Sequence, residues 1–131
     1  NSRMPEKLYK LNLLKKLSHN NEEVILKLTN VFIDQAAKAV IDIKSAYEVE
    51  KFDLVSTIAH KIKPTFGYFA IEGIEKDIEM IELLANLEMP SADLEMLIKR
   101  LEMVTMAVIE EMKQDVELST STYLKTEVAT N

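Results

Sequence analysis

Apolar residues recur three and four positions apart along most of this 131-residue chain, and this spacing is the strongest constraint on its fold. Such spacing places apolar side chains on one face of an α-helix. Only two glycines and three prolines occur, and β-branched residues do not alternate as they do in strands. The sequence therefore predicts an all-α protein with long amphipathic helices at about residues 20–47, 51–68, 72–87 and 92–117.

Short polar residues mark where several of these helices begin, because their side chains can cap free backbone N–H groups. Asn12 is the expected cap of a short leading helix, and Asn20 with Glu23 resembles a capping box for the first long helix. Ser91 is the expected cap of the last one. Four long helices with short connections predict an antiparallel four-helix bundle with a short additional N-terminal helix.

The two ends of the chain differ from this pattern. We expect residues 1–7 to be a flexible lead and the polar, aperiodic residues 119–131 to be a tail, which leaves the bundle to residues 8–118. The net charge of −6 argues against nucleic-acid binding, and no apolar run approaches the roughly 20 residues that cross a bilayer. The absence of cysteine is compatible with the cytoplasm. We interpret the seven methionines as core residues.

The predicted helix over residues 51–68 carries an unusual polar face. His60, Lys63 and Gly67 fall together on its outward side, with Asp53 and Ser56. The opposite side carries the apolar stripe Val55, Ile58, Ala59, Ile62, Phe66 and Phe69. An exposed imidazole beside an ammonium group suits an anion, and a glycine in a helix, which costs about 1 kcal/mol, leaves room for a close approach.

The sequence Ala59-His60-Lys61-Ile62-Lys63, with a small residue at Gly67, resembles the signature of the histidine-containing phosphotransfer (HPt) domain. In that family a lysine stands three residues after the histidine, a glycine usually follows the lysine, and the seventh position is small. Pro64 departs from the pattern. It lacks the N–H that would bond to the carbonyl group of His60.

The resemblance implies a phosphorelay intermediate. His60 would accept a phosphoryl group from the aspartate of a response-regulator receiver domain and pass it to another receiver. Lys63 would stabilise the phosphoryl oxygens, with Lys61 a weaker second candidate, and Lys61, Pro64 and Gly67 would lie on the docking face. The chain would need no cofactor of its own, since the receiver supplies magnesium.

Several further expectations accompany this interpretation. The chain has no Gly-rich phosphate loop, so we expect a carrier that cannot use ATP rather than an enzyme. We also expect a cytoplasmic monomer, either free-standing or excised from a hybrid sensor kinase. Which imidazole nitrogen reacts depends on what holds the other. Folding the next helix back places residues around 79–83 beside His60, so Glu82 and Glu79 are candidates to accept a hydrogen bond from Nδ1, and we favour Glu82.

Two other functions compete with the relay. In the first alternative the chain is a helical interaction module in which His60 is incidental. A labelling assay with a phosphorylated receiver would distinguish this module from a relay, because only a relay would become labelled. A metal enzyme built in the bundle core would need inward-facing Glu-x-x-His motifs, and neither His19 nor His60 lies in one. His19 is expected to be an ordinary surface residue, and no metal site is predicted.

Overall fold

The computed structural model describes residues 7–130, and the side chains of residues 7–119. This part of the chain forms helices and no strand. The helices are α1 (Asn12–Leu17), α2 (Glu22–Glu48), α3 (Phe52–Tyr68), α4 (Ile74–Ala85) and α5 (Ala92–Thr130). The predicted all-α fold is confirmed.

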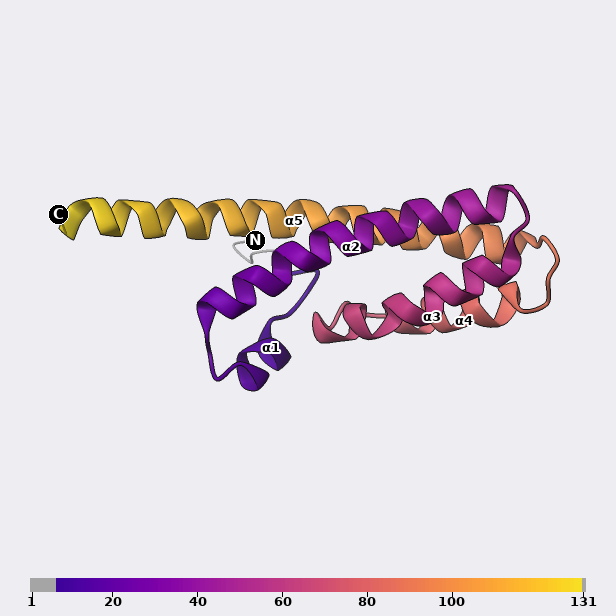
Figure 1. Cartoon of the computed structure of the whole chain (residues 1–131), viewed down its shortest axis with the longest axis horizontal. Coiled ribbons are helices and arrows are strands. Elements are labelled where there is room, and N and C mark those ends of the chain that lie inside the picture. The colour runs from indigo at the N-terminus through magenta and orange to yellow at the C-terminus, as the bar shows by residue number, and fades with distance from the viewer. Residues whose placement is uncertain (1–6, 131) are drawn as a thin grey trace, which may run out of the picture.

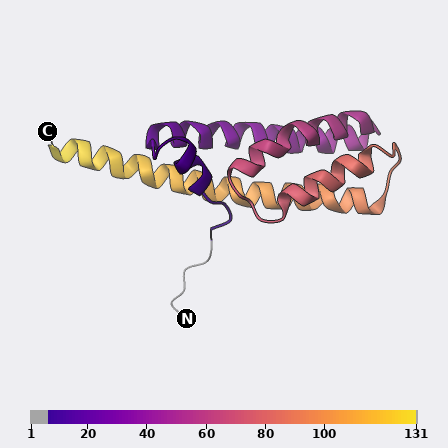
Figure 2. The same ribbon diagram turned by 90° about the horizontal axis from the view of Figure 1, so that it is seen from below.

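The four long helices form a closed ring. α3 packs against α2 and α4, and α5 contacts the same two helices (Figures 1 and 2). The connections are short, at residues 49–51, 69–73 and 86–91, so successive helices run antiparallel. α1 packs against the first part of α2 and lies outside the ring. This is the antiparallel four-helix bundle with a short leading helix that the sequence predicts.

The core lies along the axis of this ring and takes residues from each long helix. Its fully buried large side chains include Phe32, Ile43, Val55, Phe66, Ile78, Leu94, Leu101 and Met112. Each such side chain contributes about 1.5–3 kcal/mol on transfer from water. The apolar spacing read from the sequence therefore coincides with the buried faces.

Two predicted caps are wrong by one residue. α2 is capped by Asn21, whose Oδ1 accepts from the N–H of Val24 at 3.1 Å, while Asn20 adopts a left-handed conformation with φ 60°. Asn12 is the first residue of α1 and not its cap. Ser91 does cap α5, since its Oγ accepts from the N–H of Leu94 at 3.0 Å.

The last helix extends past its predicted end near Glu117 and continues to Thr130. The physical reason is that residues 118–130 contain no glycine or proline to stop it. In Figure 1 this end of α5 projects beyond the other helices. The segment predicted as a tail is therefore helical over residues 119–130, and residue 131 lies outside the described residues.

The interpretation of the methionines as core residues is also wrong for most of those described. Only Met112 is buried, whereas Met80, Met89, Met96, Met103 and Met106 are at least 40% exposed. Four of these lie on the helices α4 and α5, where an unbranched side chain favours the helix without needing to be buried. Met4 lies outside the described residues.

Across the described chain, no helix combines the length and apolar character of a membrane span.

The N-terminal segment is fastened to α5. Lys7 Nζ lies 2.9 Å from both carboxylate oxygens of Asp115, and the Tyr9 hydroxyl donates to the same carboxylate at 2.5 Å. The backbone N–H of Leu8 donates to Glu111 at 2.9 Å. Lys7, which the sequence analysis placed in a flexible lead, therefore contacts the bundle; residues 1–6 of that lead lie outside the described residues.

Candidate functional site

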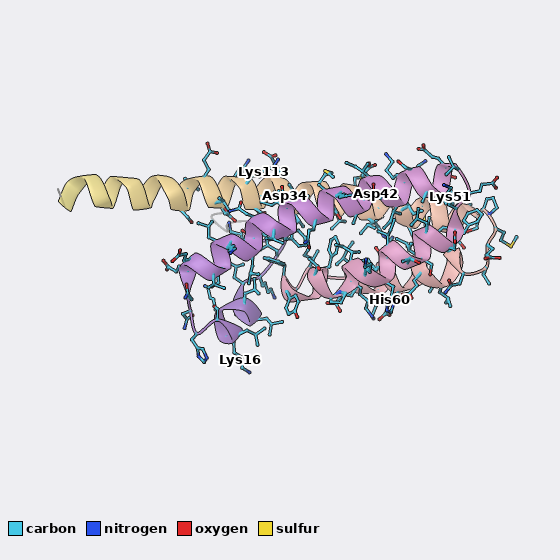
Figure 3. All side chains as sticks on the ribbon, viewed as in Figure 1. Lys16, Asp34, Asp42, Lys51, His60 and Lys113 are labelled. Carbon is cyan, nitrogen blue, oxygen red and sulfur yellow. The ribbon has the colours of Figure 1, made fainter. Side chains whose placement is uncertain are left out.

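The site lies midway along α3, on its outward face. The His60 side chain is 76% exposed and points away from α2 (Figure 3). It is held there because the opposite face of α3 is buried, with Val55, Ala59 and Phe66 fully enclosed. The predicted orientation of the helix is thus confirmed for His60.

Ser56 is an exception to the predicted outward face. It is buried, and its hydroxyl donates to Asn86 Oδ1 at 2.8 Å. Ser56 is buried because α4 covers part of this face of α3, and the residue spacing within α3 alone does not reveal that contact. Ser56 therefore joins α3 to the end of α4.

Pro64 lies inside α3, which continues to Tyr68. A proline in a helix interior gives no N–H to the residue four positions earlier, so the His60 carbonyl group lacks that partner. The helix persists because Ile62 and Phe66, on either side of the proline, are anchored in the core. Pro64 itself is exposed beside His60.

A row of polar pairs runs between α3 and α4. His60 faces Glu82, Lys63 faces Glu79 and Gly67 faces Glu75. Steps of three and four residues along α3 are matched by equal steps back along α4, as two antiparallel helices in contact require. We call these three pairs the α3–α4 row. The Ser56–Asn86 bond continues the same register by one turn.

The first pair concerns the imidazole. Glu82 Oε1 lies 2.9 Å from His60 Nδ1, and the Glu82 side chain is 28% exposed. The contact is the one favoured for Glu82 from the sequence. In the tautomer that donates Nδ1–H to this carboxylate, Nε2 keeps a free lone pair.

The second pair concerns the lysine. Lys63 Nζ donates to Glu79 Oε1, and this hydrogen bond is the main cause of a raised pKa for Lys63. Charge attraction from Glu79, Glu75 and Glu82 acts in the same direction, whereas burial opposes it. Lys63 is therefore a protonated ammonium group at neutral pH. Glu79, the alternative candidate for Nδ1, is bonded to the lysine instead.

The third pair changes the interpretation of Gly67. A Cβ atom added at Gly67 would lie 3.2 Å from Glu75 Oε1, so the Glu75 carboxylate already occupies the space beside this glycine. From the sequence, this space was expected to admit an approaching receiver. The structure shows instead that the glycine admits a side chain from the neighbouring helix.

These groups surround one open pocket on the outside of the bundle, lined by His60, Lys63, Pro64, Glu75 and Glu82. Lys61 is exposed on α3 and does not line this pocket. Within the described part of the chain, no group of three carboxylate or imidazole side chains is arranged to hold a metal ion. His19 is exposed in the connection before α2.

Sequence reasoning missed Glu75. The signal was available in principle, because Glu75, Glu79 and Glu82 repeat on α4 with the spacing that Gly67, Lys63 and His60 show in reverse on α3. Sequence reasoning also gave no role to Gly73, which precedes α4 with φ 76°. A non-glycine residue rarely adopts this conformation, so Gly73 positions the start of α4 and with it the row of glutamates.

No family model matches the sequence, and no curated protein is significantly similar to it. Two solved structures are similar in fold. Histidine-containing phosphotransfer protein B from Pseudomonas aeruginosa PAO1 superposes with a TM-score of 0.74 at 15% identity, covering 86% of this chain and 97% of that one.

The second is the HPT domain of a sensor hybrid histidine kinase from Shewanella, with a TM-score of 0.69 at 18% identity, covering 83% of this chain and 93% of that one. At these identities the likeness establishes the fold alone. The chain thus has the helical-bundle fold of histidine-containing phosphotransfer proteins, which agrees with the resemblance found in the sequence.

Proposed function

We propose that the chain is a phosphorelay intermediate that carries a phosphoryl group on His60 between receiver domains. One observation carries the proposal above the others. On a fold shared with phosphotransfer proteins, the exposed imidazole has a carboxylate 2.9 Å from Nδ1 and an ammonium group one helical turn away. An incidental surface histidine needs neither neighbour.

Glu82 would prepare the imidazole for attack. By accepting a hydrogen bond from Nδ1–H, it keeps the Nε2 lone pair directed away from α4 and free to react. The ring gains positive charge as Nε2 forms a bond, and a carboxylate at 2.9 Å stabilises that charge. No general base is required, because neutral imidazole has no proton on the attacking nitrogen.

The transfer step is a displacement at phosphorus. The Nε2 lone pair forms a P–N bond while the P–O bond to the receiver aspartate breaks, and the aspartate leaves as a carboxylate. The Nδ1 proton remains between the ring and Glu82. In the onward step the same bonds form and break in reverse order with a second receiver, and imidazole leaves as a neutral molecule.

Lys63 would compensate the charge on the phosphoryl oxygens, since phosphoryl transfer depends chiefly on alignment and charge stabilisation. Magnesium would come from the receiver. The chain would act as a carrier without an ATP site of its own and would dock receivers through the surface formed by the exposed residues Lys61 and Pro64 and the half-buried Gly67. We place it in the cytoplasm as a monomer that binds no nucleic acid, either free-standing or as part of a hybrid sensor kinase.

The test is transfer of radiolabel from a receiver that carries a labelled aspartyl phosphate. The parent chain and the His19→Gln variant should become labelled, and His60→Gln should not. His19→Gln is the matched control, because His19 is the other histidine of the chain and is also exposed. Equal labelling of His60→Gln and the parent would refute the assignment, and absence of label from all three with every receiver tried would favour the interaction module.

A further inference from the structure

The α3–α4 row holds more negative charge than a phosphate site needs. The open pocket beside His60 is lined by the carboxylates of Glu75 and Glu82, and Glu79 is bonded to the lysine of the same pocket. Lys63 is the one cation among the five residues that line it. A phosphoryl group on Nε2 would bring up to about two further negative charges to this place.

Lys63 is already engaged before that group arrives. Its ammonium group donates to Glu79, and its side chain is 33% exposed, whereas Glu79 is 57% exposed. An exposed pair of this kind is only weakly held, so it can exchange partners at little cost. The phosphoryl oxygens and Glu79 therefore compete for the same donor.

We propose that Glu79, by competing with the phosphoryl group for Lys63, lowers the stability of phosphorylated His60 and so favours onward transfer. This inference rests on the proposed function and adds to it a positioning residue that acts through Lys63. In the unphosphorylated chain Lys63 bonds to Glu79. In the phosphorylated chain it is divided between Glu79 and the phosphoryl oxygens, and repulsion from Glu75 adds to the effect.

The consequence is a carrier that gives up its phosphoryl group readily. Removing the charge of Glu79 would release Lys63 to the phosphoryl oxygens and stabilise the phosphorylated form. Competition predicts that the effect passes through the lysine, because Glu79 does not line the pocket and bonds to the lysine that does. This dependence on Lys63 distinguishes competition for the lysine from a general effect of the net charge of the chain.

The experiment uses phosphoramidate in the presence of ammonium, which needs no receiver. Nε2 of His60 forms a P–N bond while the P–N bond of phosphoramidate breaks and ammonia leaves, and excess ammonium drives the reverse reaction. Intact mass spectrometry then gives the fraction of chain phosphorylated at equilibrium, and from it the equilibrium constant. The parent, Glu79→Gln, Lys63→Ala and the double variant are compared.

Glu79→Gln should raise this equilibrium constant about tenfold, as expected for a charge-assisted hydrogen bond transferred to the phosphoryl group. In the Lys63→Ala background the same substitution should change it less than about twofold. Glu95→Gln is the matched control, since Glu95 is exposed, pairs with Lys99 on α5 and lies outside the pocket, and it should leave the constant unchanged.

Equal constants for the parent and Glu79→Gln would overturn the inference, and so would an equal increase in the Lys63→Ala background. Neither result would contradict the proposed carrier function, because His60 would still be labelled in every variant. Failure of His60 in the parent to accept any phosphoryl group, from phosphoramidate and from receivers alike, would instead remove the proposed function and the inference together.

Discussion

Two regions of the molecule combine a carboxylate with a lysine and a ring, and they differ in the burial of the ring. At the N-terminal segment, Asp115 accepts hydrogen bonds from Lys7 and Tyr9, and Tyr9 is only 6% exposed. We call these three residues the anchoring cluster. In the α3–α4 row, Glu82 and Glu79 bond to His60 and Lys63 at the open surface. The chemical groups are similar, but the surroundings are not.

The anchoring cluster is continuous with the core. The Tyr9 ring packs on Phe69, and Phe69 packs on Phe32 with ring centres 4.7 Å apart. Burial, together with the hydrogen bond to Asp115, raises the pKa of Tyr9, so the hydroxyl remains a donor at any physiological pH. Such a cluster fixes the chain in one arrangement. The pairs of the row, by contrast, lie at the surface, where they can exchange partners without disturbing the core.

The largest effect should follow from Phe66→Ala, on the face of α3 opposite the row. Phe66 is fully buried and its ring centre lies 5.2 Å from that of Phe32. Truncation should lower the free energy of unfolding by about 3–5 kcal/mol, measured by urea denaturation. His60→Gln, on the same helix, should unfold like the parent. A Phe66→Ala protein of parental stability would mean that α3 is rotated and that the comparison fails.

Gly67→Gln should affect the row and spare the fold. The glycine is helical and the nearest obstacle is the flexible end of Glu75, so melting should remain near that of the parent. The displaced carboxylate and the added bulk should disturb docking, and a misplacement of about 1 Å can slow transfer roughly 100-fold. Labelling by phosphoramidate should persist. Loss of both reactions would show that Gly67 is structural.

Lys63→Ala should slow transfer from a phosphorylated receiver by about tenfold, because a charge-assisted contact to the phosphoryl oxygens is removed. Single-turnover kinetics would measure it. Thermal stability should stay close to that of the parent, since the pair with Glu79 is exposed. If stability fell while the transfer rate was unchanged, Lys63 would belong with the anchoring residues rather than with the site.

The smallest effect is expected from Asp115→Asn, and it should depend on pH. Burial tends to raise the pKa of Asp115, but hydrogen bonds from Tyr9 and Lys7 outweigh it and the pKa is lowered. A lowered folded-state pKa stabilises the protein above the unfolded value and loses that contribution as pH falls through the folded value. The free energy of unfolding of the parent should exceed that of the variant by about 1 kcal/mol at pH 7, a difference that shrinks below about pH 4. Denaturation at several pH values would detect it, and a difference independent of pH would contradict the assignment.

The sequence predicted the architecture and the orientation of His60 because both follow from apolar spacing along single helices. It could not fix the helix ends, since Asn20 and Asn21 are equally capable caps and only one can be used. Nor could it foresee that Glu50, Ala70 and Glu88 take left-handed conformations in the connections, as none of them is a residue typical of such turns.

Within the site, the contact of Glu82 with His60 was predictable because it needs only the register of two adjacent helices. The positions of Glu75 and Glu79 depend also on side-chain conformation. The rotamer of Glu75 decides whether the space beside Gly67 is filled or stays open to a receiver, and the sequence does not specify that rotamer.

The central claim is that Nε2 of His60 carries the phosphoryl group while Glu82 holds Nδ1 and stabilises the phosphorylated ring. The most direct measurement is NMR of the chain labelled with ¹⁵N and phosphorylated by phosphoramidate, in which coupling between ³¹P and ¹⁵N identifies the modified nitrogen. We predict one phosphohistidine, at Nε2 of His60, and in the Glu82→Gln variant a less stable form at the same nitrogen. Phosphorylation at Nδ1, or at His19, or none on either histidine, would contradict the claim.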